Sequence, residues 1–324
     1  MVTPAAPLRI VFFGTPDFAV PTLEALHGSR HQVVAVITQP DRARGRGQHS
    51  QPGPVKQLAE RAGLTILQPQ RLRDEAFLEA FRTLDADLGV VAAYGKILTD
   101  AVLAVPRLGL VNVHASLLPK YRGAAPIHRA VMAGETVTGV TIMRVVKALD
   151  AGSMLSKVAR PIGDAETSVD VEHDMARLGA AALVETVDAM ASGPVTETPQ
   201  DESEATYAHK LEKTDGIVDW SRPARAIHNQ IRGLHPWPHA FSELQGERTI
   251  LLRSEVEREP QQLHAAPGVV IEASPERFAV QTGDGVLRLL TVQREGRRAV
   301  TAREFVAGRR VEPGAAFVSP CIAP

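Results

Sequence analysis

The sequence predicts an α/β protein, with a Rossmann-like, mostly parallel sheet covered by helices on both faces and a small β-barrel domain after it. Apolar, β-branched runs alternate with helical patterns through the first half of the chain, as in parallel sheets buried on both faces. A polar segment with two prolines follows at residues 192–207. Beyond it, short strands are separated by turn signals about every 8–12 residues, which is typical of a small barrel.

Each element of the first part follows from a local pattern. Thr15-Pro16-Asp17 places a cap residue and a proline at the start of a helix over Phe18–Leu26. The β-branched run Gln32–Thr38 indicates a strand. The same criteria predict helices at Pro54–Ala62, Asp74–Leu84, Ala125–Ala133 and Val169–Met190, and strands at Leu8–Phe13, Leu64–Leu67, Asp87–Ala93, Leu108–His114 and Gly139–Val146.

The second part reads as mostly β. After a helix near Ala224–Ile231, turn signals at Gly246, Pro275 and Gly283-Asp284-Gly285 separate the expected strands, which are Arg248–Arg253, Gly268–Ala273, Phe278–Thr282 and Val286–Gln293. The predicted domains are therefore residues 1–191 and 208–316, joined by a linker at residues 192–207 and followed by a tail at residues 317–324.

Composition is that of a globular protein, with 44% hydrophobic and 23% charged residues. No segment approaches the roughly 20 apolar residues of a membrane span, so no membrane partner is expected. The single cysteine, Cys321, excludes an internal disulfide and a multi-cysteine zinc site, and it fits a reducing, cytoplasmic location. No metal is expected, and nothing in the sequence requires more than a monomer.

The formal net charge of −1 does not favour nucleic acid, but the arginines are unevenly distributed. Seven of them stand against two glutamates between Arg288 and Arg310, and Arg42, Arg44 and Arg46 are opposed only by Asp41. Charge alone leaves two interpretations open for both clusters, a surface for phosphates or a solvated face.

The first strand–helix turn argues against a nicotinamide dehydrogenase, the default function for such a fold. A dinucleotide-binding turn needs several glycines so that the backbone can approach a pyrophosphate. Here the turn is Gly14-Thr-Pro-Asp-Phe-Ala19, with one glycine and an acid at the helix start. That turn should repel a phosphate.

Three polar residues alternate at the end of the strand Leu108–His114 and just beyond it. Asn112, His114 and Ser116 are two apart, so their side chains project from one face. Asp150 lies in the loop after the strand Gly139–Val146, and neighbouring parallel strands would place their C-terminal loops side by side. Taken alone, His114 is as readily structural as functional, Asn112 is more readily a structural residue, and Asp150 is more readily a turn residue, but together they indicate a site.

An amide, an imidazole and a carboxylate suit acyl transfer to an amine. The amine is the nucleophile, so no serine or cysteine is needed. Asn112 and His114 can donate hydrogen bonds to the developing oxyanion, at about 3–4 kcal/mol per donor. Asp150 can orient the imidazole and accept a proton from the amine, directly or through water.

These residues lie in a pattern, Asn112-x-His114-x-Ser116-Leu-Leu-Pro119 followed by Arg122-Gly-Ala-Ala-Pro-Ile127, that resembles the formyltransferases that use 10-formyltetrahydrofolate. Further motifs resemble the branch of this family that acts on methionyl initiator tRNA. They are Phe13-Gly-Thr-Pro-Asp-Phe-Ala19, Gln39-Pro-Asp-Arg-Ala-Arg-Gly-Arg-Gly47, Pro54-Val-Lys56, Ala93-Tyr-Gly-Lys-Ile-Leu98, Gly139-Val-Thr-Ile-Met143, Pro236-Trp-Pro238 and Thr282-Gly-Asp-Gly285.

The resemblance implies a function and a site. It implies transfer of the formyl group of 10-formyltetrahydrofolate, the co-substrate, to the α-amine of methionyl initiator tRNA. The matching catalytic residues are Asn112, His114 and Asp150, and the folate would sit against the turn Ser116, Leu117, Leu118 and Pro119. It also implies that Arg42, Arg44 and Arg46 lie in a loop that enters the tRNA acceptor arm. The C-terminal barrel would be of the OB type and present a basic surface to the same arm.

Two departures concern loops. The family usually has lysines after its Gly-Arg-Gly, where this chain has Gln48-His-Ser-Gln51, and it has Gly-Leu-Asp-Thr-Gly where this chain has Ala148-Leu-Asp-Ala-Gly152. Ala148 restricts the backbone more than glycine does.

Two rival functions remain at this stage. A formyltransferase acting on a nucleotide-linked amino sugar could use the same first domain, but it gives no reason for the arginine-bearing loop and the barrel. A tRNA- or single-strand-binding protein would favour aromatic-rich strands. The strands from Arg248 to Gln293 contain one aromatic residue, Phe278, which argues against this alternative.

Overall fold

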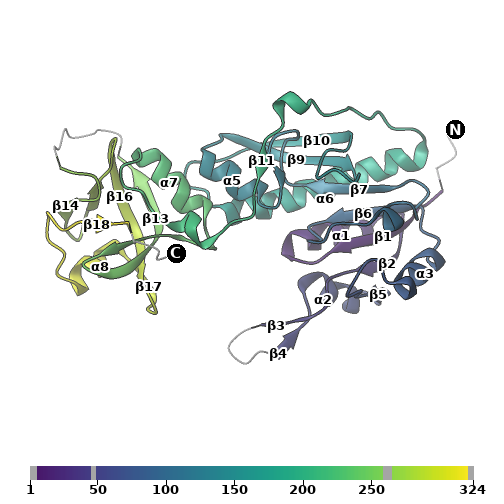
Figure 1. Cartoon of the computed structure of the whole chain (residues 1–324), viewed down its shortest axis with the longest axis horizontal. Coiled ribbons are helices and arrows are strands. Elements are labelled where there is room, and N and C mark those ends of the chain that lie inside the picture. The colour runs from purple at the N-terminus through teal and green to yellow at the C-terminus, as the bar shows by residue number, and fades with distance from the viewer. Residues whose placement is uncertain (1–5, 45–48, 258–264, 320–324) are drawn as a thin grey trace. The chain divides into compact units, whose positions relative to one another are not determined.

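The computed structural model describes residues 6–44, 49–257 and 265–319 (Figure 1). The chain forms two compact units, and each contains several stretches of sequence. The first unit comprises Met1–Gly123, Thr138–Arg160 and Glu172–Ala208, and the second comprises Ala124–Val137, Pro161–Val171 and His209–Pro324. Residues 192–207, which the composition indicated as a linker, therefore fold with the first unit.

The first unit is built on a seven-stranded sheet with the strand order β10-β9-β7-β6-β1-β2-β5. Four pairings along β7-β6-β1-β2-β5 are parallel, which confirms the mostly parallel α/β prediction. The strands are β1 (Arg9–Gly14), β2 (Gln32–Ile37), β5 (Ile66–Leu67), β6 (Leu88–Ala92), β7 (Leu110–His114), β9 (Val137–Arg144) and β10 (Met154–Pro161).

Strand β9 differs from the expectation, because it runs antiparallel to β7, with Val111 opposite Arg144 and His114 opposite Thr141. The loop after β9 therefore starts at the Leu110 end of β7, where the Val145 amide donates to the Leu110 carbonyl at 2.9 Å. The argument that parallel strands bring Asp150 beside His114 was wrong, and other contacts must place Asp150.

The four helices predicted in this unit match their expected positions to within a few residues, whereas the short helix Asp100–Leu103 was not predicted. Helix α3 buries Phe77, Leu78 and Phe81. The Phe81 ring packs edge-on against the Phe13 ring, with the ring centroids 5.8 Å apart. The Tyr94 ring also packs edge-on against Phe13, with ring centroids 5.5 Å apart, so aromatic rings form part of the core beside β1. The helices are α1 (Val20–His27) after the 3-10 turn η1 (Asp17–Ala19), α2 (Pro54–Arg61), α3 (Glu75–Thr83), α4 (Asp100–Leu103) and α6 (Ser168–Ser192).

Two short two-stranded sheets complete the first unit. Strands β3 (Arg42–Arg44) and β4 (His49–Gln51) form an antiparallel hairpin. Strands β8 (Arg122–Gly123) and β11 (Tyr207–Ala208) pair in parallel, which ties the end of the 192–207 segment to the chain just after the Ser116–Pro119 turn.

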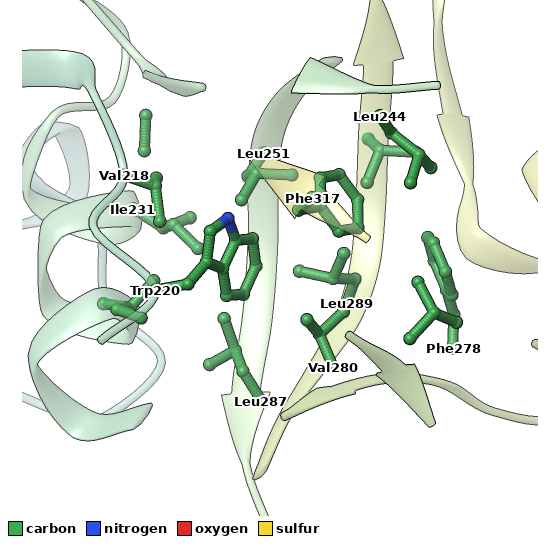
Figure 2. Close-up of a cluster of buried hydrophobic side chains, with 14 of the residues drawn as sticks. Val218, Trp220, Ile231, Leu244, Leu251, Phe278, Val280, Leu287, Leu289 and Phe317 are labelled. Carbon is green, nitrogen blue, oxygen red and sulfur yellow. The ribbon is translucent and has the colours of Figure 1, made fainter. Parts of the chain in front are cut away.

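The second unit is an antiparallel, OB-like barrel with the strand order β14-β15-β16-β13-β12-β18, and β17 pairs with β16. Its core packs Trp220, Phe278 and Phe317 among aliphatic side chains (Figure 2). The Trp220 indole donates to Ser242 Oγ at 3.0 Å. The strands are β12 (Ala240–Leu244), β13 (Glu247–Val256), β14 (Val270–Ala273), β15 (Phe278–Gln281), β16 (Val286–Arg294), β17 (Ala299–Thr301) and β18 (Phe317–Val318).

Helices of the second unit come from two regions of the sequence. Helix α5 (Pro126–Ala133) packs against α7 (Ala224–Gly233), and Arg129 on α5 forms a two-pronged ion pair with Asp215 at 2.8 and 2.9 Å. Helix α8 (Ala302–Gly308) begins with a capping box between Thr301 and Glu304, in which each side chain accepts a hydrogen bond from the backbone amide of the other residue. No helix in the described part of the chain is long and apolar enough to cross a membrane.

Candidate active site

Strand β7 presents the polar side chains that the sequence singled out. Val111 and Val113 are buried on one face, and Asn112 and His114 alternate with them on the other. The Asn112 side chain is half-buried, and its amide has no hydrogen-bond partner among the residues that the structure describes. A buried amide without a hydrogen-bond partner costs free energy, and a ligand that bonds to it would remove this cost. The Asn112 amide is therefore available to a ligand.

His114 is 5% exposed as a residue, and its imidazole is held at one nitrogen. Its Nε2 lies 3.0 Å from the backbone carbonyl oxygen of Tyr121. A carbonyl can only accept, so Nε2 carries the proton in this bond. Nδ1 then holds the lone pair of the neutral ring, and this atom lies 3.7 Å from Asp150 Oδ2.

Asp150 is directed at His114 by its own loop. Its backbone has φ of 48°, the left-handed region that few non-glycine residues adopt. The Gly123 amide donates to Oδ2 at 2.9 Å, whereas Oδ1 has no partner within the described ranges. The carboxylate is 16% exposed, so it faces a site that solvent and substrate can reach. The structure thus brings Asn112, His114 and Asp150 to one face of β7.

The turn after β7 is fixed mainly by backbone contacts. The Ser116 hydroxyl donates to the Lys120 carbonyl at 2.6 Å. Thr141 Oγ1 donates to the Ser116 carbonyl and accepts from the Leu118 amide, at 2.7 and 3.1 Å. Ser116, Leu118 and Pro119 are buried, and Leu117 keeps partial exposure. Leu117 is thus the side chain of this turn that a ligand could contact.

Two further residues at the site were missed by sequence reasoning. Gln200 contacts the Asp150 loop, and Arg122, only 2% exposed, contacts Gln200. Arg122 stood in a motif quoted for the family resemblance, so a buried role could have been considered. Gln200 carried no signal, because it lies in a polar segment that resembled a linker.

Two of the three predicted tRNA-binding arginines fall on the β3–β4 hairpin. Arg42 and Arg44 lie in β3, paired with Gln51 and His49, and Arg46 lies outside the described residues. Asp41, at the base of β3, accepts from Lys56 Nζ at 2.5 Å and from Gln68 at 2.8 Å. The hydrogen bond from Lys56 is the main cause that lowers the pKa of Asp41. Asp41 therefore serves to anchor the hairpin.

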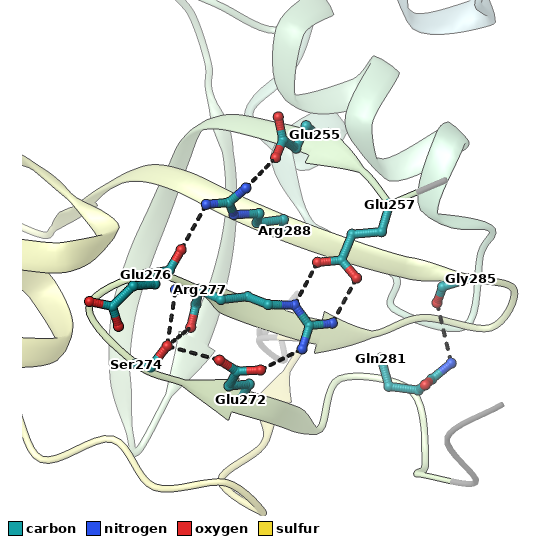
Figure 3. A network of polar contacts seen from close by, with 9 residues as sticks. All are labelled: Glu255, Glu257, Glu272, Ser274, Glu276, Arg277, Gln281, Gly285 and Arg288. Carbon is teal, nitrogen blue, oxygen red and sulfur yellow. Dashed lines mark hydrogen bonds and ion pairs between the residues drawn. The ribbon is translucent and has the colours of Figure 1, made fainter. Parts of the chain in front are cut away.

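The second arginine cluster is largely neutralised in the second unit. Five of its seven arginines form ion pairs with glutamates, at 2.8 to 3.2 Å. Arg297 and Arg303 are exposed and have no ion pair among the described residues. Arg277 adds a further pair of contacts, to Glu257 and Glu272, beside Arg288 and Glu255 (Figure 3). The paired arginines are Arg288, Arg294, Arg298, Arg309 and Arg310.

Comparisons with known proteins agree with this arrangement. The family model described as Formyl transferase matches residues 8–187, and the model described as Formyl transferase, C-terminal domain, matches residues 210–310. The methionyl-tRNA formyltransferase of Heliobacterium modesticaldum is 46% identical over 316 residues, 96% of this chain and 100% of that protein. The methionyl-tRNA formyltransferase of Stutzerimonas stutzeri is 47% identical over 304 residues, 94% of this chain and 96% of that protein.

A solved structure shows the same fold at low identity. The N-formyltransferase from Helicobacter canadensis, in complex with folinic acid and dTDP-3-aminofucose, has a TM-score of 0.69 and 17% identity, covering 89% of this chain and 99% of that chain. The two family models together span both units, and the curated relatives match almost from end to end. The chain belongs to the methionyl-tRNA formyltransferase family.

Proposed function

We propose that this protein transfers the formyl group of 10-formyltetrahydrofolate to the α-amino group of methionyl initiator tRNA, with Asn112, His114 and Asp150 as its catalytic residues. The observation that carries the proposal is the convergence of these three side chains on one face of β7 in a member of this family. The products are N-formylmethionyl-tRNA and tetrahydrofolate. Because charged initiator tRNA is used in translation, we place the reaction in the cytoplasm. We treat the enzyme as a monomer, since the site in the first unit is built from one chain.

The donors stabilise the negative charge that develops on the formyl oxygen. Asn112 donates from its unpaired amide. His114 donates from Nδ1 when the ring is protonated, because Nε2–H is directed to the Tyr121 carbonyl. Each such donor contributes about 3–4 kcal/mol to a transition state of this kind. The Asp150 carboxylate lies 3.7 Å from Nδ1 of His114.

Asp150 also handles the proton. The neutral α-amine attacks the formyl carbon, a C–N bond forms, and the nitrogen becomes positively charged. Asp150 accepts one of its protons through Oδ1, which has no other partner among the described residues. The bond from the formyl carbon to N10 of the folate then breaks, and N10 leaves with that proton, so the atoms and charges balance.

The residues after β7 fit a folate beside these groups. We assign Ser116, Leu117, Leu118 and Pro119 to the folate site. Leu117 offers an apolar surface, and the other three shape the turn. Leu149, 59% exposed and adjacent to Asp150, adds apolar surface. The bound folate supplies the activated formyl group, and these residues hold it against Asn112 and His114.

We assign tRNA binding to the β3–β4 hairpin through Arg42, Arg44 and Arg46. The anchoring of Asp41 by Lys56 and Gln68 supports this role, because it fixes the hairpin base. In the second unit, Arg297 and Arg303 are better candidates for phosphate contacts than the five paired arginines. An arginine in an ion pair must first break its contact with the glutamate before it can bind a phosphate. We assign catalysis to the predicted domain of residues 1–191 and tRNA binding to that of residues 208–316. The fold modifies these bounds, because residues 192–207 fold with the first unit and Phe317–Val318, at the start of the predicted tail 317–324, form β18 of the second unit.

Formyl incorporation from 10-formyltetrahydrofolate tests the substrate. Initiator methionyl-tRNA and a nucleotide-linked amino sugar are offered to the same enzyme, and we expect formyl transfer to the tRNA alone. Transfer to the sugar alone would replace the proposal by its nearest rival. In parallel, His114→Ala and Asp150→Ala should abolish transfer while circular dichroism shows an intact fold. Near-wild-type turnover in either variant would remove that residue from the mechanism.

A further inference from the structure

Residues 198–208, here called the strap, belong to the first unit and contact the loop that carries Asp150 through Gln200. At its start, Thr198 and Met154 exchange backbone hydrogen bonds of 2.8 and 2.9 Å. At its end, Thr206 accepts from the Arg122 amide at 2.8 Å, and β11 pairs with β8. The strap is thus fixed at both ends to the unit that contains the site.

Gln200 uses every hydrogen-bonding position of its side-chain amide. Its nitrogen donates to the backbone carbonyls of Asp150 and Gly152, at 2.7 and 2.8 Å. Its oxygen accepts from Nε and Nη2 of Arg122, at 3.0 and 2.8 Å. A side-chain amide has two donors and two acceptor lone pairs, so a flipped amide would set its oxygen against two carbonyls. The orientation of Gln200 is therefore determined by its partners.

Arg122 links Gln200 to the other contact of Asp150. Its guanidinium also donates to both carboxylate oxygens of Glu202, at 2.7 and 2.9 Å. The next residue, Gly123, donates its amide to Asp150 Oδ2. The backbone of Asp150 is thereby held by the strap, and its carboxylate is held by the residue that follows Arg122.

The Asp150 loop needs such support for two reasons. Its start lies at the Leu110 end of β7, because β9 is antiparallel, so no strand end directs Asp150 to His114. Asp150 also adopts a positive φ of 48°, a region that costs free energy for residues with a side chain, although Asp tolerates it better than most. External hydrogen bonds to the loop carbonyls must hold this conformation.

We infer that Gln200 is a positioning residue that sets the carboxylate of Asp150 for proton transfer. The inference rests on the proposed role of Asp150 and extends the catalytic machinery to a segment that resembles a linker in sequence. Gln200 acts only through Asp150, so its loss should lower kcat without weakening substrate binding.

Two substitutions separate the donor from the acceptor function of Gln200. Gln200→Glu keeps oxygens that accept from Arg122 and loses the donors to the Asp150 loop, and Gln200→Met loses both at similar length. We expect kcat to fall on the order of 10–100-fold in both. The KM values for methionyl-tRNA and 10-formyltetrahydrofolate should stay within about twofold. Glu197→Gln, which breaks the nearby Arg144–Glu197 ion pair of 2.8 Å, is the matched control and should keep wild-type kcat.

The outcomes distinguish this inference from the proposed function. Wild-type kcat in both Gln200 variants overturns it, as does a loss confined to KM or one shared by Glu197→Gln. Asp150→Asn is assayed alongside. If Asp150→Asn is inactive while the Gln200 variants are normal, only the positioning role fails. If Asp150→Asn keeps wild-type kcat, the proposed function of Asp150 fails first. Thermal unfolding of each variant shows that the fold is retained, and a collapse of Tm together with kcat in both Gln200 variants counts against positioning.

Discussion

The Nδ1 atom of His114 lies 3.7 Å from Oδ2 of Asp150, although the loop that carries Asp150 begins at the opposite end of β7. That distance is too long for a hydrogen bond but short enough for the carboxylate to act on the charge of the ring. The space around this pair, next to the unpaired amide of Asn112, is where we place the formyl group.

Asn112→Asp tests the amide donor with almost no change in shape. The substitution replaces the NH2 group by an oxygen that cannot donate and that repels a developing oxyanion. We expect kcat to fall about 10²–10³-fold, with little change in either KM. Asn229→Asp is the matched control, because Asp at that position keeps the oxygen that accepts from Arg232. A turnover within a few-fold of wild type in Asn112→Asp, measured by formyl incorporation, contradicts the donor role.

His114→Asn and His114→Gln test which ring nitrogen faces the substrate. An asparagine amide reaches the position of Nδ1, and a glutamine amide reaches that of Nε2, which here donates to Tyr121. We expect both variants to lose activity, by about 10²–10⁴-fold, with His114→Asn retaining more kcat than His114→Gln. The exposed His173 provides a control, His173→Gln, which should be unaffected. The reverse order of the two His114 variants would show that Nε2 is the catalytic nitrogen.

The features that the sequence predicted correctly are local ones. Asn112 and His114 were placed on one face because strand periodicity depends only on neighbours in the sequence. The parallel sheet and the barrel followed from repeated short patterns in the same way. The strand β10 was missed because its exposed alternate residues, such as Lys157 and Ala159, give it no continuous apolar run.

The features that could not be predicted depend on pairs of residues far apart in the sequence. The antiparallel direction of β9 is set by its partners, and its apolar composition is the same for either direction. Gln200 meets Asp150 from 50 residues away. The basic cluster after Arg288 is reduced by glutamates such as Glu247, which pairs with Arg309 from 62 residues away. Counting charges within a window does not detect such neutralisation.

Replacing Arg42, Arg44 and Arg46 together by alanine tests the hairpin as a tRNA contact. We expect KM for methionyl-tRNA to rise while KM for 10-formyltetrahydrofolate stays the same. With each phosphate contact that is lost, tRNA binding releases fewer counterions. The slope of log affinity against log salt concentration should therefore flatten by up to about 0.7–0.9 per arginine. An unchanged tRNA KM and salt slope would take the hairpin out of the binding surface.

A second triple variant controls for the loss of three positive charges. Arg30, Arg82 and Arg107 are surface arginines that pair with carboxylates in the same unit. Arg30 precedes the amino-terminal end of β2, and Arg107 pairs with Asp87 just before the amino-terminal end of β6. Both lie away from the strand ends that carry the hairpin and the site. Their replacement by alanine should leave the tRNA KM and the salt slope close to wild type.

Acidification should destabilise the protein through its buried histidines, of which His228 is the clearest. Burial lowers the pKa of His228 below its usual value. The neutral ring is 5% exposed and is bonded to the Asp164 carbonyl at Nε2 and to Ser254 Oγ at Nδ1. The unfolded chain then binds a proton that the folded chain does not, near the ordinary histidine pKa of about 6.5. Stability is therefore full above that pH and falls as the pH drops below it.

Thermal unfolding measured between about pH 7.5 and 5.5 checks this linkage. The wild-type Tm should fall on acidification, and His228→Gln, which cannot take up the proton, should show a smaller fall. The exposed His173→Gln should follow the wild-type curve. Identical pH slopes for His228→Gln and the wild type would show that the buried ring does not contribute.

Gly152→Ala tests how tightly the Asp150 loop is packed against β9. A Cβ at Gly152 would lie 1.9 Å from the backbone carbonyl oxygen of Arg144 and 2.8 Å from its carbon. Arg144 cannot yield easily, because it is paired with Val111 of β7. The loop must therefore move, and Asp150, two residues away, moves with it. We expect a loss of about 1–3 kcal/mol in the free energy of unfolding and a fall in kcat on the order of 100-fold.

The comparison variant is Gly28→Ala, at the end of α1. There the added Cβ would lie 3.4 Å from the nearest backbone oxygen, at a φ of −80° that alanine readily adopts. Urea unfolding and formyl transfer should both stay near wild type in this control. If Gly152→Ala loses stability but keeps kcat, the loop moves without displacing Asp150, and the carboxylate is then set by Gly123 alone. If Gly152→Ala keeps both wild-type stability and wild-type kcat, the loop adjusts without cost. Close packing of the loop on Arg144 then has no part in placing the Asp150 carboxylate.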